Sequence, residues 1–209
     1  VGSEMCIRDS PYRERKVKIL NGLHTMSVLA GYNAGFKIVR DMINDKAFKA
    51  YIDKGLNEEI IKTIDLDENE LKAFANSVLE RFNNPFIDHK LLDISLNSVA
   101  KFKARCLCSL LDYYNKFGKI PSVLSFSFAA LINFYENFEN KDYPVNDVES
   151  VLHFFKVKHN DIVFDVLANV GFWGDDLTKI DGLYKKVKAY FDNIKLLGIS
   201  KAMEKLLDE

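Results

Sequence analysis

The sequence predicts an all-α protein made of many helices. From residue 11 onward, apolar residues recur every three or four positions, which is the spacing of one helix face. Several of these runs begin at a capping residue and end at a proline or a glycine. Strand-like alternation is confined to the short segment 17–20. A chain of 209 residues, 48% of them hydrophobic, is long enough for a substantial core in one domain or a closely joined pair.

The composition argues against nucleic-acid and membrane functions. The 29 basic and 30 acidic residues give a formal net charge of −1, so no overall field attracts nucleic acid or an anionic membrane. No apolar run reaches the length of about eighteen residues that a membrane-spanning helix needs. We therefore expect a protein that binds neither nucleic acid nor membranes.

The first ten residues are expected to be foreign to the natural protein. Segment 1–10 lacks the apolar stretch of a signal peptide and the amphipathic pattern of a transit peptide. It resembles translated sequencing-adapter DNA, which recurs at the ends of open reading frames from shotgun assemblies. On this interpretation the natural sequence is cut near Ser10, and Cys6 has no function. We expect one helical domain over residues 11–209, as a fragment of a longer protein.

The first well-defined helix is predicted directly after Asp67. Asp67 and Glu70 have the spacing of a capping box, and Asn84-Pro85 supplies a stop signal. Between these signals the apolar face is unbroken and consists of Leu71, Phe74, Ala75, Val78, Leu79 and Phe82.

Two further helices are predicted nearer the C-terminus. One opens near Asn146, with Glu149 at its third position, and is expected to bury Val148, Val151, Leu152 and Phe155. The other ends at Leu197, because Gly198 suits a C-cap, and is expected to bury Ile180, Leu183, Val187, Phe191 and Ile194. Segment 141–144, Lys-Asp-Tyr-Pro, is the best candidate for a joint between a main helical body and a C-terminal subdomain.

The sequence shows no metal-binding motif and no nucleotide-binding loop. Cys6, Cys106 and Cys108 are poorly spaced for zinc, and their odd number argues against a disulfide framework. Reduced thiols fit a cytoplasmic protein. Gly31 and Gly35 lack the spacing and the preceding strand of a dinucleotide-binding fingerprint. We expect no nucleotide-binding domain within this chain.

Lys16, Asn21 and His24 form a first candidate site. A cation, an amide and an imidazole at offsets of five and three can converge on one polar atom if the segment is helical. Together they could hold a carbonyl oxygen. Spacing alone favours a solvated lysine and a structural histidine instead.

Asn97, Lys101 and Arg105 form a second candidate site. Their spacing of four predicts that they share one helical face. Two cations one turn apart repel each other, so an acidic partner would be stabilising. An arginine fork and a lysine point charge suit a carboxylate or a phosphate. The pattern alone favours a solvated basic face that also includes Lys103.

Three motifs, taken in their order along the chain, point to a known family. The first is segment 15–25, with the order Lys-x-x-x-x-Asn-x-x-His. The second is Asn-Glu-Glu-Ile-Ile at 57–61, and the third is Arg-Phe-Asn-Asn-Pro at 81–85, followed by His89. This order resembles the polyol-specific long-chain dehydrogenase family of mannitol, fructuronate and tagaturonate enzymes. The resemblance covers nearly the whole chain after Ser10 and implies the helical C-terminal domain of that family.

Segment 94–102 resembles the tagaturonate reductase branch of the family. The mannitol and fructuronate members typically have Ile-Ala-Met-Asp-Gly-Ser before a lysine, whereas this chain has Ile-Ser-Leu-Asn-Ser-Val-Ala before Lys101. The form Leu-Asn-Gly-x-His-Thr at 20–25 points the same way. The resemblance therefore implies a substrate that is a sugar acid.

The resemblance also implies roles for the first candidate site. Hydride transfer to or from a carbinol carbon needs a proton donor or acceptor at the attached oxygen, and Lys16 matches the family's general acid/base. Asn21 and His24 match the residues that hydrogen-bond this oxygen. For Lys16 to act near neutral pH, burial or nearby positive charge must lower its pKa, with Arg15 and Lys18 as candidates.

The remaining expectations concern substrate, cofactor and partners. Lys101, helped by Arg105 and Asn97, is expected to bind the hydroxyl chain or the carboxylate of the substrate. NAD would be bound mainly by a dinucleotide-binding domain absent from this chain, so no cofactor-binding residue is assigned and NADP is left as an alternative. We expect a cytoplasmic monomer, and an isolated fragment that folds but is inactive. A fructuronate reductase, a mannitol 2-dehydrogenase and a helical interaction module without catalysis are the alternatives.

Overall fold

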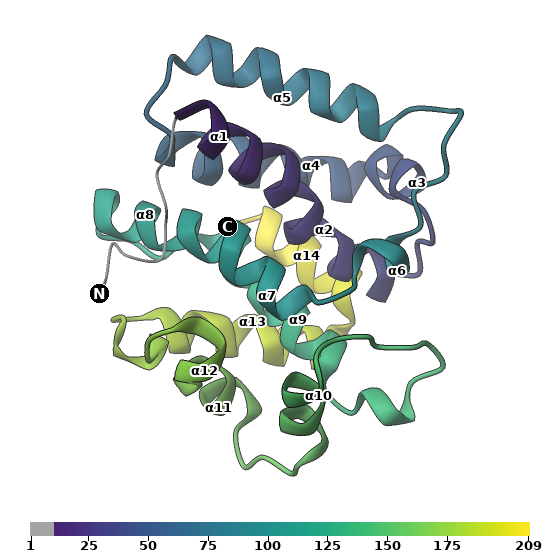
Figure 1. The fold of residues 1–209 in the computed structure, drawn as a ribbon, viewed down its shortest axis with the longest axis vertical. Coiled ribbons are helices and arrows are strands. Elements are labelled where there is room, and N and C mark those ends of the chain that lie inside the picture. The colour runs from purple at the N-terminus through teal and green to yellow at the C-terminus, as the bar shows by residue number, and fades with distance from the viewer. Residues whose placement is uncertain (1–10) are drawn as a thin grey trace.

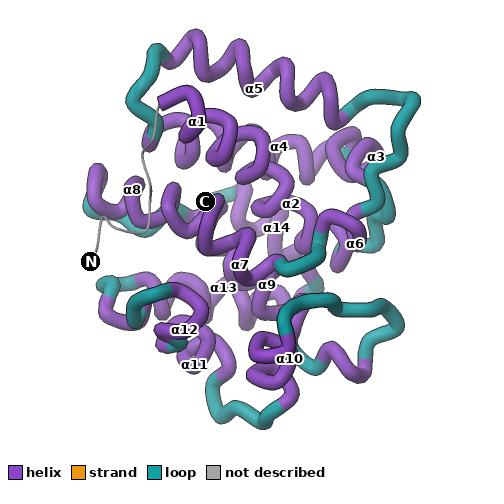
Figure 2. The backbone as a smooth tube through the Cα atoms, in the orientation of Figure 1, coloured by secondary structure: helices purple, strands orange, loops and turns teal. Residues whose placement is uncertain are grey.

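The computed structural model describes residues 11–209 as helices joined by turns and short loops (Figure 1). These residues contain no β-strand, and their only extended pairing is an isolated antiparallel bridge between Ile38 and Lys90, which confirms the expected all-α class (Figure 2). The predictions for residues 1–10, including Cys6, fall outside the described residues. The α-helices are α1 (Pro11–Arg15), α2 (Gly22–Asn33), α3 (Val39–Asn44), α4 (Lys46–Lys54), α5 (Glu68–Phe82), α6 (Leu91–Ile94), α7 (Ser98–Phe102), α8 (Cys108–Phe117), α9 (Ser122–Tyr135), α10 (Glu149–Lys156), α11 (Ile162–Ala168), α12 (Val170–Trp173), α13 (Leu183–Leu197) and α14 (Ile199–Leu207).

Short tighter or wider turns extend several of these helices. The π-helical turns are η2 (Lys16–Asn21), η3 (Gly55–Ile60) and η5 (Lys103–Leu107), and the 3₁₀ turns are η4 (Ile61–Thr63), η6 (Phe138–Asn140) and η7 (Leu177–Lys179). As a result α1, η2 and α2 form one continuous helix over 11–33, and α7, η5 and α8 form another over 98–117. Both candidate sites lie on these two interrupted helices.

Helix α5 confirms the first predicted helix. Asp67 is its N-cap, and the Asp67 carboxylate accepts hydrogen bonds of 3.0 Å from the backbone N–H groups of Asn69 and Glu70. These bonds satisfy donors that have no partner inside the helix. The helix ends at Phe82, two residues before Asn84. Its buried face consists of Leu71, Ala75, Val78 and Phe82.

The two predicted C-terminal helices are present with altered starts. α10 begins at Glu149, three residues later than expected, and Val148 is 56% exposed, so the prediction that Val148 is buried is wrong. The chain at Val148 is still extended, because it serves as the N-cap residue. α13 ends at Leu197, as predicted, and Gly198 follows with a φ of 80° that favours glycine. Ile180 is buried but precedes α13.

Segment 17–20 is helical despite its strand-like alternation. It lies inside the π turn η2, where Lys18 and Ile19 are buried. Four residues span little more than one helical turn, and alternation over that length does not distinguish a strand from a helix. Packing of η2 against α5, η3 and η5 decides the conformation.

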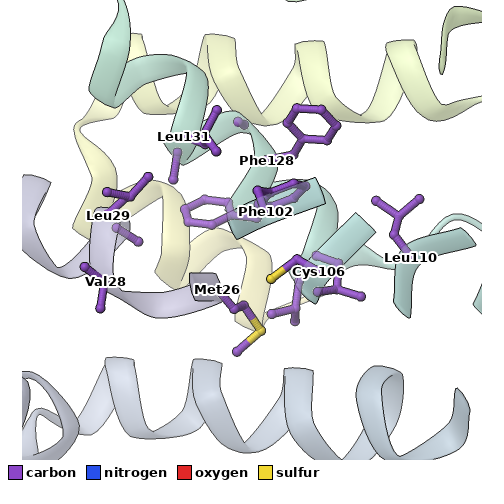
Figure 3. Close-up of a cluster of buried hydrophobic side chains, with 14 of the residues drawn as sticks. Met26, Val28, Leu29, Phe102, Cys106, Leu110, Phe128 and Leu131 are labelled. Carbon is purple, nitrogen blue, oxygen red and sulfur yellow. The ribbon is translucent and has the colours of Figure 1, made fainter. Parts of the chain in front are cut away.

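The core is organised around α9. All of its residues except Ser122 and Asn133 are buried, and it packs against α13, α2 and α14. A helix that is apolar on every side is stable only when it is covered on every side. Phe128 of α9 packs against both Phe102 and Trp173, with ring centroids 4.6 Å and 4.9 Å away. Figure 3 shows Phe102 and Phe128 together, with Met26 and Leu29 of α2 nearby.

Glu59 caps the N-terminus of α9 from inside the protein. Its two carboxyl oxygens accept hydrogen bonds from the N–H groups of Val123 and Leu124 at 2.7 Å and 2.8 Å. Glu59 is only 4% exposed, and burial raises its pKa to about 7. Gly55 starts the same π turn and lets this turn approach α2 and α9 closely. A Cβ at this position would lie 2.7 Å from both Met26 Sδ and Val123 Cγ1. The motif at 57–61 therefore has a structural role.

Segment 141–144 lies in the loop that joins η6 to α10. Lys141 Nζ donates hydrogen bonds to the carbonyl oxygens of Asn133 and Phe134 near the end of α9, at 2.5 Å and 3.1 Å. The Tyr143 ring stacks on Phe134, with a centroid distance of 5.1 Å. The loop is thus fastened to the central helix, and a joint between subdomains at this point stays a prediction.

We expect Glu59 to make the protein less stable as the pH rises through 7. Its pKa is raised in the folded state, so its stabilising contribution is complete below about pH 4.5 and is lost by about pH 7, because over this range the unfolded carboxyl is ionised while the folded one still holds its proton. The decline is on the order of 3 kcal/mol, from about 1.4 kcal/mol per pKa unit. Urea unfolding at pH 4.5 and pH 8 should show a smaller stability difference in Glu59→Gln than in the wild type.

The exposed neighbour Glu58 provides the control for this experiment. Glu58→Gln should keep the pH dependence of the wild type. An equal pH dependence in Glu59→Gln and the wild type would contradict the role assigned to Glu59.

Candidate active site

The candidate site lies where the two interrupted helices meet. The π turn η2 carries Lys16 and Asn21, the π turn η5 carries Arg105, and the two turns contact each other. A π turn widens the helix and redirects the side chains that follow it, and such turns are frequent at functional sites. Cys106 of η5 approaches this contact, with its Sγ 3.6 Å from the carbonyl oxygen of Gly22. The two candidate groups are therefore brought to one region of the protein.

Lys18 anchors the first interrupted helix from its buried side. Its ammonium lies 2.6 Å from the Glu14 carboxylate and 2.8 Å from that of Asp112 in α8. It also donates to the carbonyl and hydroxyl oxygens of Thr63, each at 3.3 Å. Because the side chain of Lys18 is only 3% exposed, these partners offset the cost of burying its charge. Lys18 thereby fixes η2 against η4 and α8.

Lys16 lies on the opposite side of η2 and is exposed. Within residues 11–209 it forms no ion pair or hydrogen bond, so its ammonium is available to a ligand. Burial was one of the two conditions that we expected for Lys16. The described residues leave its side chain exposed. Arg15 and Lys18 do not supply the expected nearby charge either, because Arg15 pairs with Glu70 at 2.5 Å and Lys18 points into the protein.

Asn21 lies half-buried at the end of η2, five residues after Lys16. Its backbone carbonyl accepts a 2.9 Å hydrogen bond from the Thr25 hydroxyl. Its side-chain amide has no hydrogen-bond partner among the described residues. The amide therefore keeps both its donors and its acceptor for a ligand.

His24 is held as a neutral ring with a buried nitrogen that no described residue bonds. The imidazole stacks on Phe82, with ring centroids 3.9 Å apart and an interplanar angle of 20°. Burial lowers the pKa of His24 to about 4, and the neighbouring His89 adds to this shift. The ring is therefore neutral at pH 7. Its Nε2 atom is buried and has no hydrogen-bond partner in the described part of the chain, which is costly unless a ligand supplies one.

Two cations lie next to His24. Arg105 Nη1 donates a 3.3 Å hydrogen bond to the Thr25 hydroxyl, and Lys101 Nζ donates a 2.8 Å hydrogen bond to the carbonyl of Ile94. Both charges act to lower the pKa of His24. Burial, and secondly the charge of Arg105, lowers the pKa of Lys101. Neither cation forms an ion pair with a described residue, so the pair attracts an anion.

Asn97 does not share a helical face with Lys101 and Arg105, so that part of the prediction is wrong. It is the residue before α7 and has the left-handed conformation, with φ of 53° and ψ of 45°. Asparagine tolerates this conformation better than most residues, so it can end one helix and start the next. Asn97 is exposed beside the first turn of α7.

Two residues of the site were not assigned roles from the sequence. Thr25 links the two halves, because its hydroxyl donates to the Asn21 carbonyl and accepts from Arg105. His89 acts electrostatically on His24, and its carbonyl accepts a 2.9 Å hydrogen bond from Val39 N beside the isolated bridge. Both belong to the quoted motifs, but only the fold places them beside residues far away in the sequence.

The described residues include no group of three or more His, Cys, Asp or Glu side chains that could hold a metal ion. None of the helices in this part of the chain is both long and apolar enough to cross a membrane. Cys106 is a free, fully buried thiol, and burial raises its pKa. Cys108 is not a free thiol, so the expectation of reduced cysteines holds in the described residues for Cys106 alone.

The described residues form an all-helical domain in which a neutral histidine lies near two cations that have no ion-pair partner. The chain belongs to the mannitol dehydrogenase C-terminal domain family, whose model matches residues 10–195. This membership confirms the family that the three sequence motifs predicted.

Curated relatives are similar over nearly the whole chain. The altronate oxidoreductase of Enterobacter sp. (strain 638) is 39% identical over 207 residues, which cover 94% of this chain and 43% of the relative. The altronate oxidoreductase of Yersinia enterocolitica is 40% identical over 204 residues, covering 92% of this chain and 42% of the relative. The chain therefore spans about two fifths of the length of these relatives.

Solved structures share the fold. Pseudomonas fluorescens mannitol 2-dehydrogenase, in a ternary complex with NAD and D-mannitol, superposes with a TM-score of 0.84 at 18% identity, covering 96% of this chain and 42% of that one. A D-sorbitol dehydrogenase in substrate-free form gives a TM-score of 0.76 at 19% identity, covering 92% of this chain and 40% of that one. At these identities the match defines the fold alone.

We expect the His24 ring to stay neutral throughout the range of pH 5.5 to 8. An NMR titration of its ring protons should have a midpoint near pH 4, since burial opposes protonation. Arg105→Gln should move this midpoint upward, because it removes a positive charge that disfavours the imidazolium. A wild-type midpoint near 6.5 would contradict the assigned burial and charge.

Proposed function

We propose that this chain is the substrate-binding and catalytic helical domain of an NAD-dependent altronate oxidoreductase, an enzyme that interconverts altronate and tagaturonate. The observation that carries the proposal is the unpartnered Nε2 of His24, which lies close to two unpaired cations. A buried polar atom without a partner indicates a ligand atom at that point. The identity of 39–40% to altronate oxidoreductases supports this choice of substrate.

The polar groups of this chain suit a carbonyl or carbinol oxygen beside a nicotinamide. The nicotinamide supplies or accepts the hydride when it is bound. Negative charge develops on the oxygen as a ketone is reduced, and hydrogen-bond donors aimed at that oxygen stabilise it. His24, as a neutral imidazole, and Asn21, through its amide, provide such donors without changing protonation state.

Lys16 supplies the proton in this proposal. It lies one π turn before Asn21, and its ammonium is exposed and unpaired within the described residues. In the direction of reduction it donates a proton to the substrate oxygen, and in oxidation its neutral amine accepts that proton. The described residues leave Lys16 exposed to solvent. In this proposal a further part of the protein covers Lys16 and removes that solvent.

Lys101 and Arg105 bind the anionic end of the substrate in this proposal. Their unpaired charges suit the carboxylate of a sugar acid, and a guanidinium can bind a carboxylate through two parallel hydrogen bonds. Asn97, which is exposed beside α7, contacts substrate hydroxyl groups in this proposal. A neutral sugar would leave both cations uncompensated, which favours a uronate over fructose.

The rest of the proposal concerns the whole protein. NAD is bound mainly by a dinucleotide-binding domain outside this chain, and no cofactor-binding residue is assigned on residues 11–209. We place the enzyme in the cytoplasm as a monomer that acts on a small sugar acid and binds neither nucleic acid nor a membrane. On this proposal residues 11–209 fold alone but do not oxidise NADH.

A chimera tests the proposed activity directly. Residues 11–209 replace the matching region of the Escherichia coli altronate oxidoreductase, a relative 40% identical over 207 residues. The chimera should oxidise NADH with tagaturonate, and more slowly with fructuronate or fructose. Lys16→Met should lower kcat by about 10²–10⁴-fold, because it removes the proton donor.

Lys46, an exposed lysine at the start of α4, provides the control for Lys16. Lys46→Met should keep the activity of the parent chimera. Preference for fructose or fructuronate, or an unchanged kcat in Lys16→Met, would overturn the proposal.

Arg105→Ala should raise KM for tagaturonate in the same chimera by about 10–100-fold, since a charge-assisted hydrogen bond contributes about 1.5–3 kcal/mol. KM for fructose should rise much less, because fructose has no carboxylate. Lys103→Ala, on the same π turn, should leave both values close to those of the parent. Equal increases for both substrates would exclude a carboxylate clamp at Arg105.

A further inference from the structure

The corner between α6 and α7 is held by a loop distant in sequence. This corner carries Asn97, in the left-handed conformation, and leads directly to Lys101. The backbone N–H of Asn97 donates a 3.0 Å hydrogen bond to the carbonyl of Asn146, in the loop before α10. This backbone hydrogen bond holds Asn97 from a loop that belongs to neither interrupted helix.

Tyr135 and Asp147 cap the first turn of α7 as a pair. The hydroxyl of Tyr135 donates a 2.5 Å hydrogen bond to Asp147 Oδ2 and accepts a 3.1 Å bond from the N–H of Ser98. The same carboxylate oxygen accepts a weaker 3.4 Å bond from the N–H of Val99. Tyr135 is fully buried, so its hydroxyl has no solvent to replace these partners. These contacts satisfy the first donors of a helix that has no other cap.

The Asp147 carboxylate also acts on the charge of Lys101. Burial and the guanidinium of Arg105 lower the pKa of Lys101, whereas Asp147 opposes this change. The Lys101 ammonium is also tied to the Ile94 carbonyl at 2.8 Å, at the other side of the same corner. The charged or titratable groups that face Lys101 are Arg105 on its own helix, Asp147 before α10 and His24 on α2. Among these, Asp147 alone stabilises the ammonium.

We propose that Asp147, held by Tyr135, is a positioning residue that sets the first turn of α7 and, through it, the place of Lys101 at the candidate site. The inference rests on the proposed function for its consequence, which is the binding of an anionic substrate by Lys101. Asp147 itself acts through α7 and Lys101 and does not touch the substrate. Its placement is independent of the motifs that identified Lys16 and His24.

A matched control lies elsewhere in the chain. Asp161 caps α11 by accepting from the N–H groups of Val163 and Phe164, at 3.0 Å and 3.1 Å. The hydroxyl of Tyr184 donates to Asp161 at 2.6 Å, so the same pair of side chains recurs there. Asp161→Asn therefore removes the charge of a capping carboxylate, and Tyr184→Phe removes the hydroxyl bonded to it, in both cases away from Lys101.

Acetylation of the 209-residue chain with acetic anhydride over pH 6 to 11 measures the charge on Lys101, because only the neutral amine reacts. Peptide mass spectrometry then gives a labelling midpoint for that residue. Asp147→Asn should move this midpoint to lower pH, since the negative charge that raises the pKa of Lys101 is lost. Asp161→Asn should leave it unchanged. No shift in Asp147→Asn, or equal shifts in both variants, would overturn the proposal.

Hydrogen exchange measures the positioning itself. In Tyr135→Phe the amides of Ser98 and Val99 should exchange about tenfold faster, because the first turn of α7 loses its cap. In Tyr184→Phe their exchange should match the wild type. Unchanged exchange in Tyr135→Phe would overturn the proposed role of Tyr135.

Kinetics in the chimera measure the consequence for substrate binding. Asp147→Asn should raise KM for tagaturonate several-fold and leave kcat nearly constant, with the increase in KM larger at pH 9 than at pH 7. A purely structural loss would lower kcat as well as raise KM, by the same factors at pH 7 and pH 9. That result would contradict the proposal. If the chimera has no activity on any sugar acid, the proposed function fails, whereas the labelling and exchange results still decide the role of Asp147.

Discussion

The buried ammonium of Lys18 is the contact on which the geometry of the site depends. It joins the helix over 11–33, which carries Lys16, Asn21 and His24, to Asp112 on the helix over 98–117, which carries Arg105. Breaking one partner of a buried ion pair typically costs about 3–5 kcal/mol, because a charge is left without compensation. Since Glu14 and Thr63 bind the same ammonium, η2 has one stable rotation about its axis. That rotation turns Lys16 outward.

The electrostatics of the site follow from the charged side chains that this packing leaves without an ion-pair partner. Lys18 and Arg15 form ion pairs within the protein, whereas Lys101 and Arg105 form none with a described residue. Their charges and the burial of the ring keep His24 neutral. A neutral donor beside two cations favours a ligand that carries a polar oxygen at one end and an anionic group at the other. This combination supports the proposal of a sugar-acid substrate.

The fold and the substrate are supported by different kinds of evidence. The superposition on mannitol 2-dehydrogenase holds at 18% identity, because the pattern of buried apolar residues around α9 can be kept while most residues change. The same fold can accept different substrates, so the fold does not select altronate. The identity of 39–40% with altronate oxidoreductases and the unpaired cations of this chain are what favour a uronate.

The sequence by itself determined the helical class, the cap and extent of α5 and the end of α13, because these depend on local spacing, and its motifs determined the family. Only the tertiary structure decided the π conformation of 16–21, the place of Asn97 outside its helix, and the joining of the two candidate groups through Thr25. It also decided which lysine is buried. Lys16 and Lys18 are alike in the sequence, and long-range partners such as Asp112 distinguish them, because no local pattern encodes a contact 94 residues away.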